Sequence, residues 1–197
     1  MTVRVIGFKE AVSPDELVVN TTSRSSESWS RGLSPFYLGP VPLYEGAVCA
    51  EAANLENAWQ FSKVYPEHLD DDRNPTQAYF EWAAAGWRDT KAHRYPMGKG
   101  AKPSYSWWAG KRLGYLEARK SIYIPLYARA VVQTHAFAHL LDLYRKTGSV
   151  TLWDFDGYDH RSLGMSMKDV VNNEKRSMGH AFVVAHLLES ILDKEKP

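Results

Sequence analysis

Polar side chains recur at helical spacing between residues 55 and 65. At about 100° per residue, four side chains fall on one narrow face of a helix, namely those of Glu56, Trp59, Gln60 and Lys63. Apolar residues cover most of the other faces, so we expect a largely enclosed helix that directs a carboxylate, an amide and an ammonium group into a polar setting. Burying an unpaired charge costs roughly several kcal/mol. The pattern therefore predicts a polar pocket or a paired set, and a solvated outer face is the alternative.

Elsewhere the chain alternates short strand patterns with longer helical ones. Strands are predicted at residues 3–8, in a strand-turn-strand segment within residues 34–48, and at residues 150–155. Helices are predicted over residues 76–86, 107–120, 125–146 and 179–192, with Gly86 and Thr147-Gly148 as stop signals. The remaining segments are predicted to be a Ser/Thr-rich loop at 21–31, an acidic turn at 70–75 and a basic loop at 96–106. This order predicts a mainly helical α+β fold.

Length and composition set the scale of that fold. A chain of 197 residues with 44% hydrophobic content can bury one good core. We expect one main domain over residues 34–197, with residues 1–33 as a strand-and-loop extension packed on it. The single cysteine, Cys49, excludes an internal disulfide and a multi-cysteine zinc site. Because the sequence shows neither a signal-peptide pattern nor about 18 consecutive apolar residues, we expect a cytoplasmic protein with no membrane partner.

Charge is unevenly placed, although the formal net charge is only +1. The segment from Lys91 to Lys120 carries one acidic residue, Glu117, and eight basic ones: Lys91, Arg94, Lys99, Lys102, Lys111, Arg112, Arg119 and Lys120. Aromatic residues are interleaved with these cations, namely Tyr95, Tyr105, Trp107 and Trp108. Cations between aromatic rings suit phosphates and bases, so nucleic acid is a candidate partner. A solvated basic face is the alternative.

Three carboxylates follow Trp153 where a predicted strand opens into a loop: Asp154, Asp156 and Asp159. Such strand ends often carry functional sites. The D-x-D-G core is also found in haloacid dehalogenase-type phosphatases, but those need a long catalytic domain after the motif, and here 38 residues follow Asp159. A calcium-binding EF-hand loop is excluded, because its sixth and twelfth positions would be Asp159 and Met165 instead of Gly and Glu. A carboxylate site and an ordinary Asp/Gly-rich turn both stay open.

Taken in order, these pieces resemble the NADAR (NAD and ADP-ribose) family over roughly residues 34–189. The resemblance rests on Ser34-Pro35-Phe36-Tyr37, the strand pair, the segment from Asn54 to Lys63, the long helix ending at Thr147-Gly148, the acidic strand end, and Met178-Gly179 before the last helix. The family's E-H-x-x-Q-x-x-K helix reads here Glu56-Asn57-Ala58-Trp59-Gln60-Phe61-Ser62-Lys63, with Asn57 in place of His. The later family signature, an acidic residue followed by W-G and N-x-L-G, is represented by Asp156 or Asp159 and by Ser177-Met178-Gly179.

The resemblance implies helices around a small sheet and cleavage of an N-glycosidic bond between ribose C1′ and a nitrogen atom. The family includes N-glycosidases of riboflavin intermediates and enzymes that remove ADP-ribose from guanine. It implies that Glu56, Asp154 or Asp156 stabilises an oxocarbenium-like sugar and that a second, protonated carboxyl group donates to the leaving nitrogen. Lys63 either attacks the ring-opened C1′ aldehyde as a Schiff base or pairs with phosphate or carboxylate. Substrate contacts are assigned to Trp59, Gln60, Trp153, Asp159, Lys99, Lys111 and Arg112.

The sequence therefore predicts an N-glycosidase acting on an ADP-ribosylated nucleobase or another phosphorylated N-riboside, with no cofactor and no metal. Two other functions stay open. One is a non-catalytic module that binds ADP-ribose, NAD or another nucleotide, which Asn57 and the missing W-G favour. The other is a DNA-directed protein that modifies or excises a base, which would have to extrude that base from the duplex. The sequence indicates no particular oligomeric state.

Overall fold

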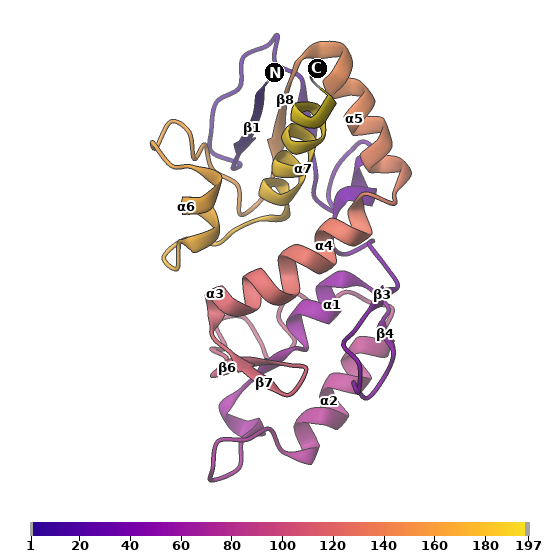
Figure 1. The fold of residues 1–197 in the computed structure, drawn as a ribbon, viewed down its shortest axis with the longest axis vertical. Coiled ribbons are helices and arrows are strands. Elements are labelled where there is room, and N and C mark those ends of the chain that lie inside the picture. Colours follow the sequence, from indigo (N-terminus) through magenta and orange to yellow (C-terminus); the bar gives the residue numbers. More distant parts are fainter. Residues whose placement is uncertain (1, 196–197) are drawn as a thin grey trace. The chain divides into compact units, whose positions relative to one another are not determined.

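The computed structural model describes residues 2–195, which divide into two compact units (Figure 1). Unit 1 joins the N-terminal residues up to Ser34 with the residues from Tyr127 onward, and unit 2 is Pro35–Leu126. Each unit combines helices with short strands, which confirms the α+β fold. The two units are described separately below.

Unit 1 is built on a three-stranded parallel sheet in the order β1-β8-β2. The central strand β8 (Ser149–Trp153) pairs with β1 (Thr2–Ile6) on one side and β2 (Val18–Asn20) on the other. In β8 the residues Val150, Thr151 and Leu152 are buried one after another, as expected for a central strand of a parallel sheet. The strands predicted at 3–8 and 150–155 are thereby confirmed. The N-terminal residues, predicted to be an extension, supply two of the three strands of this sheet.

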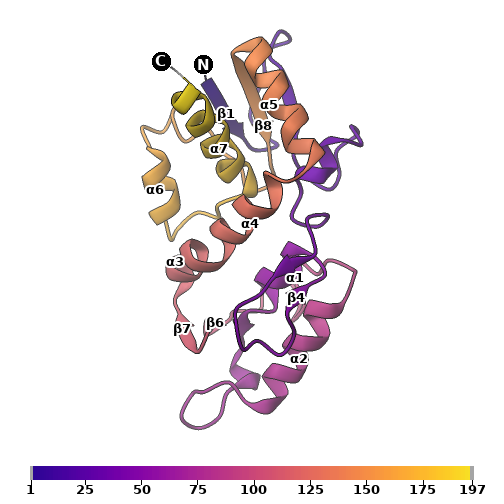
Figure 2. The same cartoon turned by 45° about the vertical axis from the view of Figure 1, so that its right-hand side comes forward.

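Three helices accompany the sheet of unit 1. Helices α5 (His135–Thr147) and α7 (His180–Glu195) lie beside it (Figures 1 and 2), where α7 contacts β1 and β8 and α5 contacts β8. The short α6 (Met167–Asn172), which the sequence pattern did not predict, begins with a capping box between Ser166 and Asp169. A short 3-10 helix, η1 (Ser30–Leu33), contacts α5.

The single helix predicted over residues 125–146 is wrong, because the structure has two helices there. Helix α4 (Ile124–Val131) ends before a turn, and the Thr134 side chain then accepts a hydrogen bond from the backbone N–H of Phe137 and starts α5. In a continuous helix this N–H would donate to the carbonyl oxygen four residues earlier. Here it donates to the Thr134 side chain, so a new helix begins at this point. The predicted stop is confirmed, since Gly148 has φ 73° and ends α5 in the left-handed conformation.

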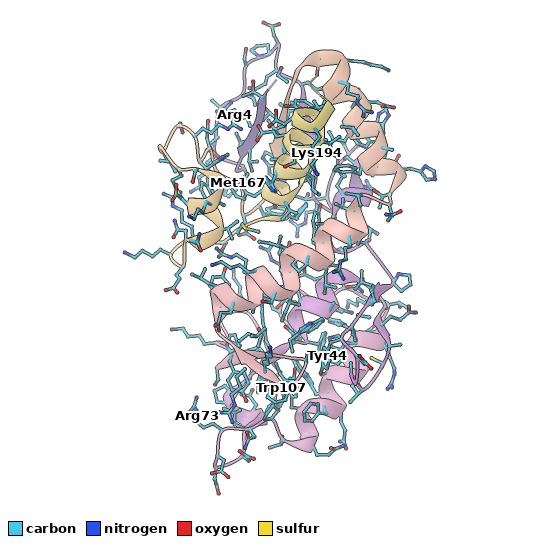
Figure 3. All side chains as sticks on the ribbon, in the orientation of Figure 1. Arg4, Tyr44, Arg73, Trp107, Met167 and Lys194 are labelled. Carbon is cyan, nitrogen blue, oxygen red and sulfur yellow. The ribbon has the colours of Figure 1, made fainter. Side chains whose placement is uncertain are left out.

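Unit 2 contains two small antiparallel sheets. One has the order β5-β6-β7, formed by β5 (Lys63–Val64), β6 (Tyr105–Trp108) and β7 (Lys111–Leu113), and the other pairs β3 (Val41–Pro42) with β4 (Glu51–Ala52). The predicted strand-turn-strand segment is therefore displaced, and residues 43–50 form the connection. In that connection Tyr44 receives a hydrogen bond from the side chain of Trp107, which fastens it to β6 (Figure 3).

The helices of unit 2 are α1 (Leu55–Gln60), η2 (Pro66–His68), α2 (Gln77–Arg88), α3 (Tyr115–Ala118) and the π-helix η3 (Arg119–Tyr123). The helix predicted over residues 107–120 is wrong in its first half, which is the β6–β7 hairpin. Ala109 (φ 50°) and Gly110 (φ 77°) make a tight turn there with both residues in the left-handed region. Helix α1 is also shorter than the predicted 55–65, because the chain leaves it after Gln60 and enters β5 at Lys63.

Gly86 lies inside α2 and does not end it, contrary to the sequence prediction, since the helix continues to Arg88. A Cβ atom at residue 86 would lie less than 3.0 Å from three atoms of the Phe61 ring. Glycine is therefore needed here so that the α2 backbone can approach that ring. Within the described residues, no helix has the length and apolar character needed to cross a membrane.

Candidate functional site

The polar side chains predicted to share one face form a continuous hydrogen-bonded chain in unit 2. The amide nitrogen of Gln60 donates to Glu56 Oε1 at 3.0 Å, and Lys63 Nζ donates to Gln60 Oε1 at 2.7 Å. Glu56 is 6% exposed and Gln60 is 8% exposed, so two of these groups are almost removed from water. The neutral amide thus stands between the carboxylate and the amine.

Local structure explains how these three side chains meet. The Asn54 side chain caps α1 by accepting from the backbone N–H of Asn57 at 2.9 Å, and this fixes where the helix begins. Glu56 and Gln60 are four residues apart in the helix and therefore lie on one face. Lys63 comes from β5, where its partner across the sheet is Ser106. The sheet, and not a further helical turn, therefore places the amine beside Gln60.

Aromatic rings border the amine of Lys63. Its Nζ lies 4.9 Å from the centre of the Trp59 ring, within the range of a cation–π contact. Trp59 in turn packs against Tyr123 of η3, with ring centres 5.4 Å apart. Burial lowers the pKa of Lys63 to about 8, and the negative charge of Glu56 opposes part of this effect. A large share of Lys63 is therefore an unprotonated, nucleophilic amine at slightly alkaline pH.

Asn57, which follows Glu56 in α1, is fully engaged with backbone. Its Nδ2 donates to the carbonyl oxygens of Asp89 at 2.8 Å and Lys91 at 2.9 Å, and its Oδ1 accepts from the N–H of His93 at 2.9 Å. The side chain is completely buried. Asn57 therefore holds the segment after α2 against α1, a role that depends on an amide with two donors and one acceptor.

The three cations predicted to contact the substrate are exposed and lie in different surface segments of unit 2. Lys99 stands in a turn between Gly98 and Gly100, whereas Lys111 and Arg112 begin β7. The Arg112 guanidinium donates to the carbonyl oxygen of Asp72 at 3.3 Å and lies 5.6 Å from the ring centre of Tyr105. These contacts tie Arg112 to the neighbouring acidic turn.

A further basic residue of unit 2 is Arg119, to which the sequence analysis gave no role. It is 2% exposed, begins the π-helix η3, and places its guanidinium 4.6 Å from the ring centre of Tyr115. Short π-helical segments occur often at functional sites. Sequence periodicity gives no signal for one, which is why Arg119 was grouped with the surface cations of its segment.

In unit 1 the carboxylate of Asp154 is 3% exposed and binds the start of α7. Its Oδ2 accepts from the backbone N–H of Ala181 at 3.1 Å, and its Oδ1 accepts from the N–H of Asp156 at 3.4 Å. A Cβ atom at Gly179 would overlap this carboxylate, so glycine is required next to it. The positive end of the helix dipole favours a negative charge at this place.

His180, to which no sequence pattern pointed, completes this group. Its Nδ1 lies 3.1 Å from Asp154 Oδ2 and its Nε2 lies 2.8 Å from the carbonyl oxygen of Thr21. Both neighbours are acceptors in their ordinary states, whereas a neutral imidazole carries a single N–H. His180 is therefore held at both ring nitrogens, by the Asp154 carboxylate on one side and by the carbonyl oxygen of Thr21 on the other.

The other predicted residues of unit 1 take part in its internal contacts. Asp159 Oδ2 accepts from Arg4 Nε at 2.9 Å, and Arg4, labelled in Figure 3, also binds Glu16. Burial raises the pKa of Asp159, but the hydrogen bonds from Arg4 and Ser162 outweigh it, and the pKa is lowered overall. The Trp153 ring packs against Phe155 with centres 5.1 Å apart. Asp156 is half-buried.

The predicted site residues thus fall into two sets. Unit 2 carries Glu56, Trp59, Gln60, Lys63, Lys99, Lys111 and Arg112, and unit 1 carries Trp153, Asp154, Asp156 and Asp159. Contacts join the first four residues of the unit 2 set into one network. Among the described residues, no group of three or more His, Cys, Asp or Glu side chains is arranged to hold a metal ion.

The chain belongs to a family of unknown function (DUF6939), whose sequence profile matches residues 6–184. The match includes all of unit 2 and most of unit 1. No curated protein and no solved structure matches the chain.

Proposed function

We propose that this protein is an N-glycoside hydrolase of the NADAR type, acting on an ADP-ribosylated nucleobase or another phosphorylated N-riboside. The observation that carries the proposal is the row of hydrogen-bonded side chains that runs from Glu56 through Gln60 to Lys63. Trp59 and Tyr123 border this row. It combines a buried carboxylate, a desolvated amine and an aromatic wall, which are the groups that this chemistry requires.

Glu56 is the proposed stabiliser of the transition state. When the base departs, positive charge develops on the ribose ring and C1′. A carboxylate that is already held by the Gln60 amide needs little reorganisation to face that charge, and low exposure to water strengthens the interaction.

Lys63 has two proposed roles that its protonation state separates. After the C1′–N bond has broken and water has added to C1′, the free sugar opens to its aldehyde; as a neutral amine Lys63 attacks this C1′ and forms a C–N bond while the carbonyl oxygen leaves as water. As an ammonium ion it pairs with a phosphate of the substrate. The pKa of about 8 makes both forms accessible near neutral pH. Trp59, which is half-buried beside Lys63, is the proposed ring on which a nucleobase stacks.

The test is incubation of the wild-type protein with DNA that carries ADP-ribosylated guanine and with a panel of N-ribosides, followed by mass spectrometry of the products. Glu56→Gln keeps the size of the side chain, and we expect it to fold and to lose hydrolysis. Glu51→Gln, an exposed carboxylate of β4, is the matched control and should retain activity. Full activity of Glu56→Gln would remove Glu56 from the mechanism.

A second candidate function is a module that binds ADP-ribose, NAD or another nucleotide without turning it over. The three backbone hydrogen bonds of Asn57 favour it, because Asn57 stands where the NADAR motif has histidine and its side chain has a structural role. Isothermal titration calorimetry with ADP-ribose and with NAD tests this candidate. Saturable binding, together with no product from any substrate, would support the module and contradict the hydrolase.

A further inference from the structure

We infer that Gln60 is a positioning residue whose side-chain amide keeps the Glu56 carboxylate and the Lys63 amine apart, so that they do not close into a direct ion pair. The inference rests on the proposed function in one respect, since it takes Glu56 and Lys63 as the reacting groups. It replaces the earlier assignment of Gln60 as a substrate contact.

The hydrogen bonds of the amide fix its orientation. Its Nε2 is a donor and faces the carboxylate of Glu56, and its Oε1 is an acceptor and faces the amine of Lys63. An ionised carboxylate only accepts and an ammonium only donates. Turning the amide over would place N–H groups against the amine and the carbonyl oxygen against the carboxylate, and both contacts would become repulsive. A single arrangement of the three groups is therefore favoured.

The hydrogen bond and the ring contact of Nζ are both made with uncharged groups, and the charge of Glu56 acts on it from farther away. Gln60 Oε1 lies 2.7 Å away and satisfies one N–H, and the Trp59 ring centre lies 4.9 Å away. If Glu56 took the place of the amide oxygen, its full negative charge would stabilise the ammonium form. Because Gln60 is 8% exposed, water would screen that charge poorly. The neutral amide therefore allows the amine to remain partly unprotonated.

This separation assigns different tasks to the two reacting groups. Glu56 accepts a hydrogen bond from the Gln60 N–H, which holds its carboxyl group in place to face a developing positive charge. Lys63 keeps a neutral fraction that can attack an aldehyde carbon. A direct ion pair would neutralise the carboxylate and remove the amine's lone pair from use. Gln60 itself has no part in bond making or breaking.

The test measures how the reactivity of Lys63 depends on pH, without any glycoside substrate. The full chain is treated briefly with formaldehyde and cyanoborohydride at a series of pH values, and labelling of the Lys63 peptide is followed by mass spectrometry. In this reaction the amine adds to the carbonyl carbon, water leaves, and hydride from the borohydride reduces the imine. The exposed Lys99 serves as the internal reference.

In the wild-type protein, we expect the labelling midpoint of Lys63 near pH 8. Gln60→Glu keeps the length of the side chain and places a carboxylate against the amine. The midpoint should rise by at least one pH unit, so labelling of Lys63 at pH 8 should fall about fivefold or more. Gln77→Glu, the same substitution on the exposed start of α2, should leave the midpoint unchanged. A wild-type midpoint near 10.5, or an unchanged midpoint in a folded Gln60→Glu protein, would overturn the inference.

A second measurement keeps the inference testable if Gln60→Glu does not fold. In the wild-type protein, the side-chain amide resonances of Gln60 are followed by nitrogen-15 NMR from pH 6 to 10. We expect them to shift with the same midpoint as the labelling of Lys63, and resonances that stay constant would contradict the contact. Both measurements are independent of hydrolysis, so a protein without glycosidase activity would refute the proposed function and leave this inference intact.

Discussion

Helix propensity and packing predict opposite effects when alanine replaces Gly86. In a helix interior, alanine is favoured over glycine by about 1 kcal/mol, so propensity alone predicts a more stable protein. The added methyl group, however, would meet the Phe61 ring at less than 3.0 Å. Phe61 is 5% exposed and its ring packs against Trp82 with centres 4.6 Å apart, so it has little room to move.

The packing cost is expected to be the larger of the two effects. Overpacking of a buried site typically costs 1–3 kcal/mol, roughly, and an overlap with three ring atoms belongs at the upper end of that range. After subtraction of the propensity gain, Gly86→Ala should lower the free energy of unfolding by about 2 kcal/mol. For a chain of this length, that corresponds to a fall in Tm of about 4–8 °C.

Calorimetry measures the Tm, and hydrogen exchange of the α2 amides shows whether the loss lies in unit 2. Ala85→Gly, at the neighbouring exposed position, is the control and should cost only the propensity difference of about 1 kcal/mol. In a Phe61→Ala background the ring is gone, and Gly86→Ala should then be neutral or stabilising. A Gly86→Ala protein at least as stable as the wild type would refute the packing explanation.

Three further predictions follow from the two units. The pKa of Lys63 falls from 10.5 to about 8 on folding, so the unfolded chain binds more protons than the folded one between these pH values. The free energy of unfolding of the wild type, compared with that of Lys63→Met, should therefore rise with pH in this range. Urea titrations at pH 8 and 10 that show no such rise would contradict the prediction. Asp154→Ala breaks the buried pair of unit 1 and should lower the free energy of unfolding by about 3 kcal/mol. Adding His180→Gln to this variant should lower it little further, and additive losses in Tm would show that the two residues act separately. If nucleic acid is a partner, DNA binding should weaken steeply as the salt concentration rises. Lys99→Gln should reduce the slope of the log binding constant against log salt concentration by about one, whereas Lys146→Gln in unit 1 should leave it unchanged. Affinity that does not depend on salt would argue against that partner.

Hydrophobic periodicity predicted the elements that are determined by their own apolar pattern and not by pairing with distant residues. Strand β8 reads as an apolar run and α2 carries an apolar stripe, so these two were found close to their observed positions. The apolar stripe over residues 125–146 was interpreted as one helix, because it continues across the break between α4 and α5. The pattern over 55–65 failed in its second half, because pairing of Lys63 with Ser106 in the sheet overrides the helical spacing. The hairpin that begins at Tyr105 was missed for a similar reason, since it depends on a turn formed by Ala109 and Gly110.

The candidate site shows the same division between local and distant contacts. The helical spacing of Glu56 and Gln60 accounts for their contact, whereas Lys63 reaches Gln60 from β5 and not from the helix that the spacing predicted. The tasks of Asn57 and His180 were not predictable, because the partners of Asn57 come more than thirty residues later, at Asp89 to His93, and His180 meets Thr21 from the other end of the chain. No single-sequence pattern reports such contacts.

Two of the predicted catalytic carboxylates, Glu56 and Asp154, differ in the groups that bind their oxygen atoms. Asp154 accepts from two backbone N–H groups and faces His180, so its contacts hold the start of α7. Glu56 accepts from a side-chain amide whose other end holds a reactive amine beside an aromatic ring. Replacement of Asp154 should therefore lower Tm first, whereas replacement of Glu56 by the isosteric amide should lower turnover with little loss of Tm. Measuring Tm and turnover for both variants would show which carboxylate belongs to the chemistry and which to the fold.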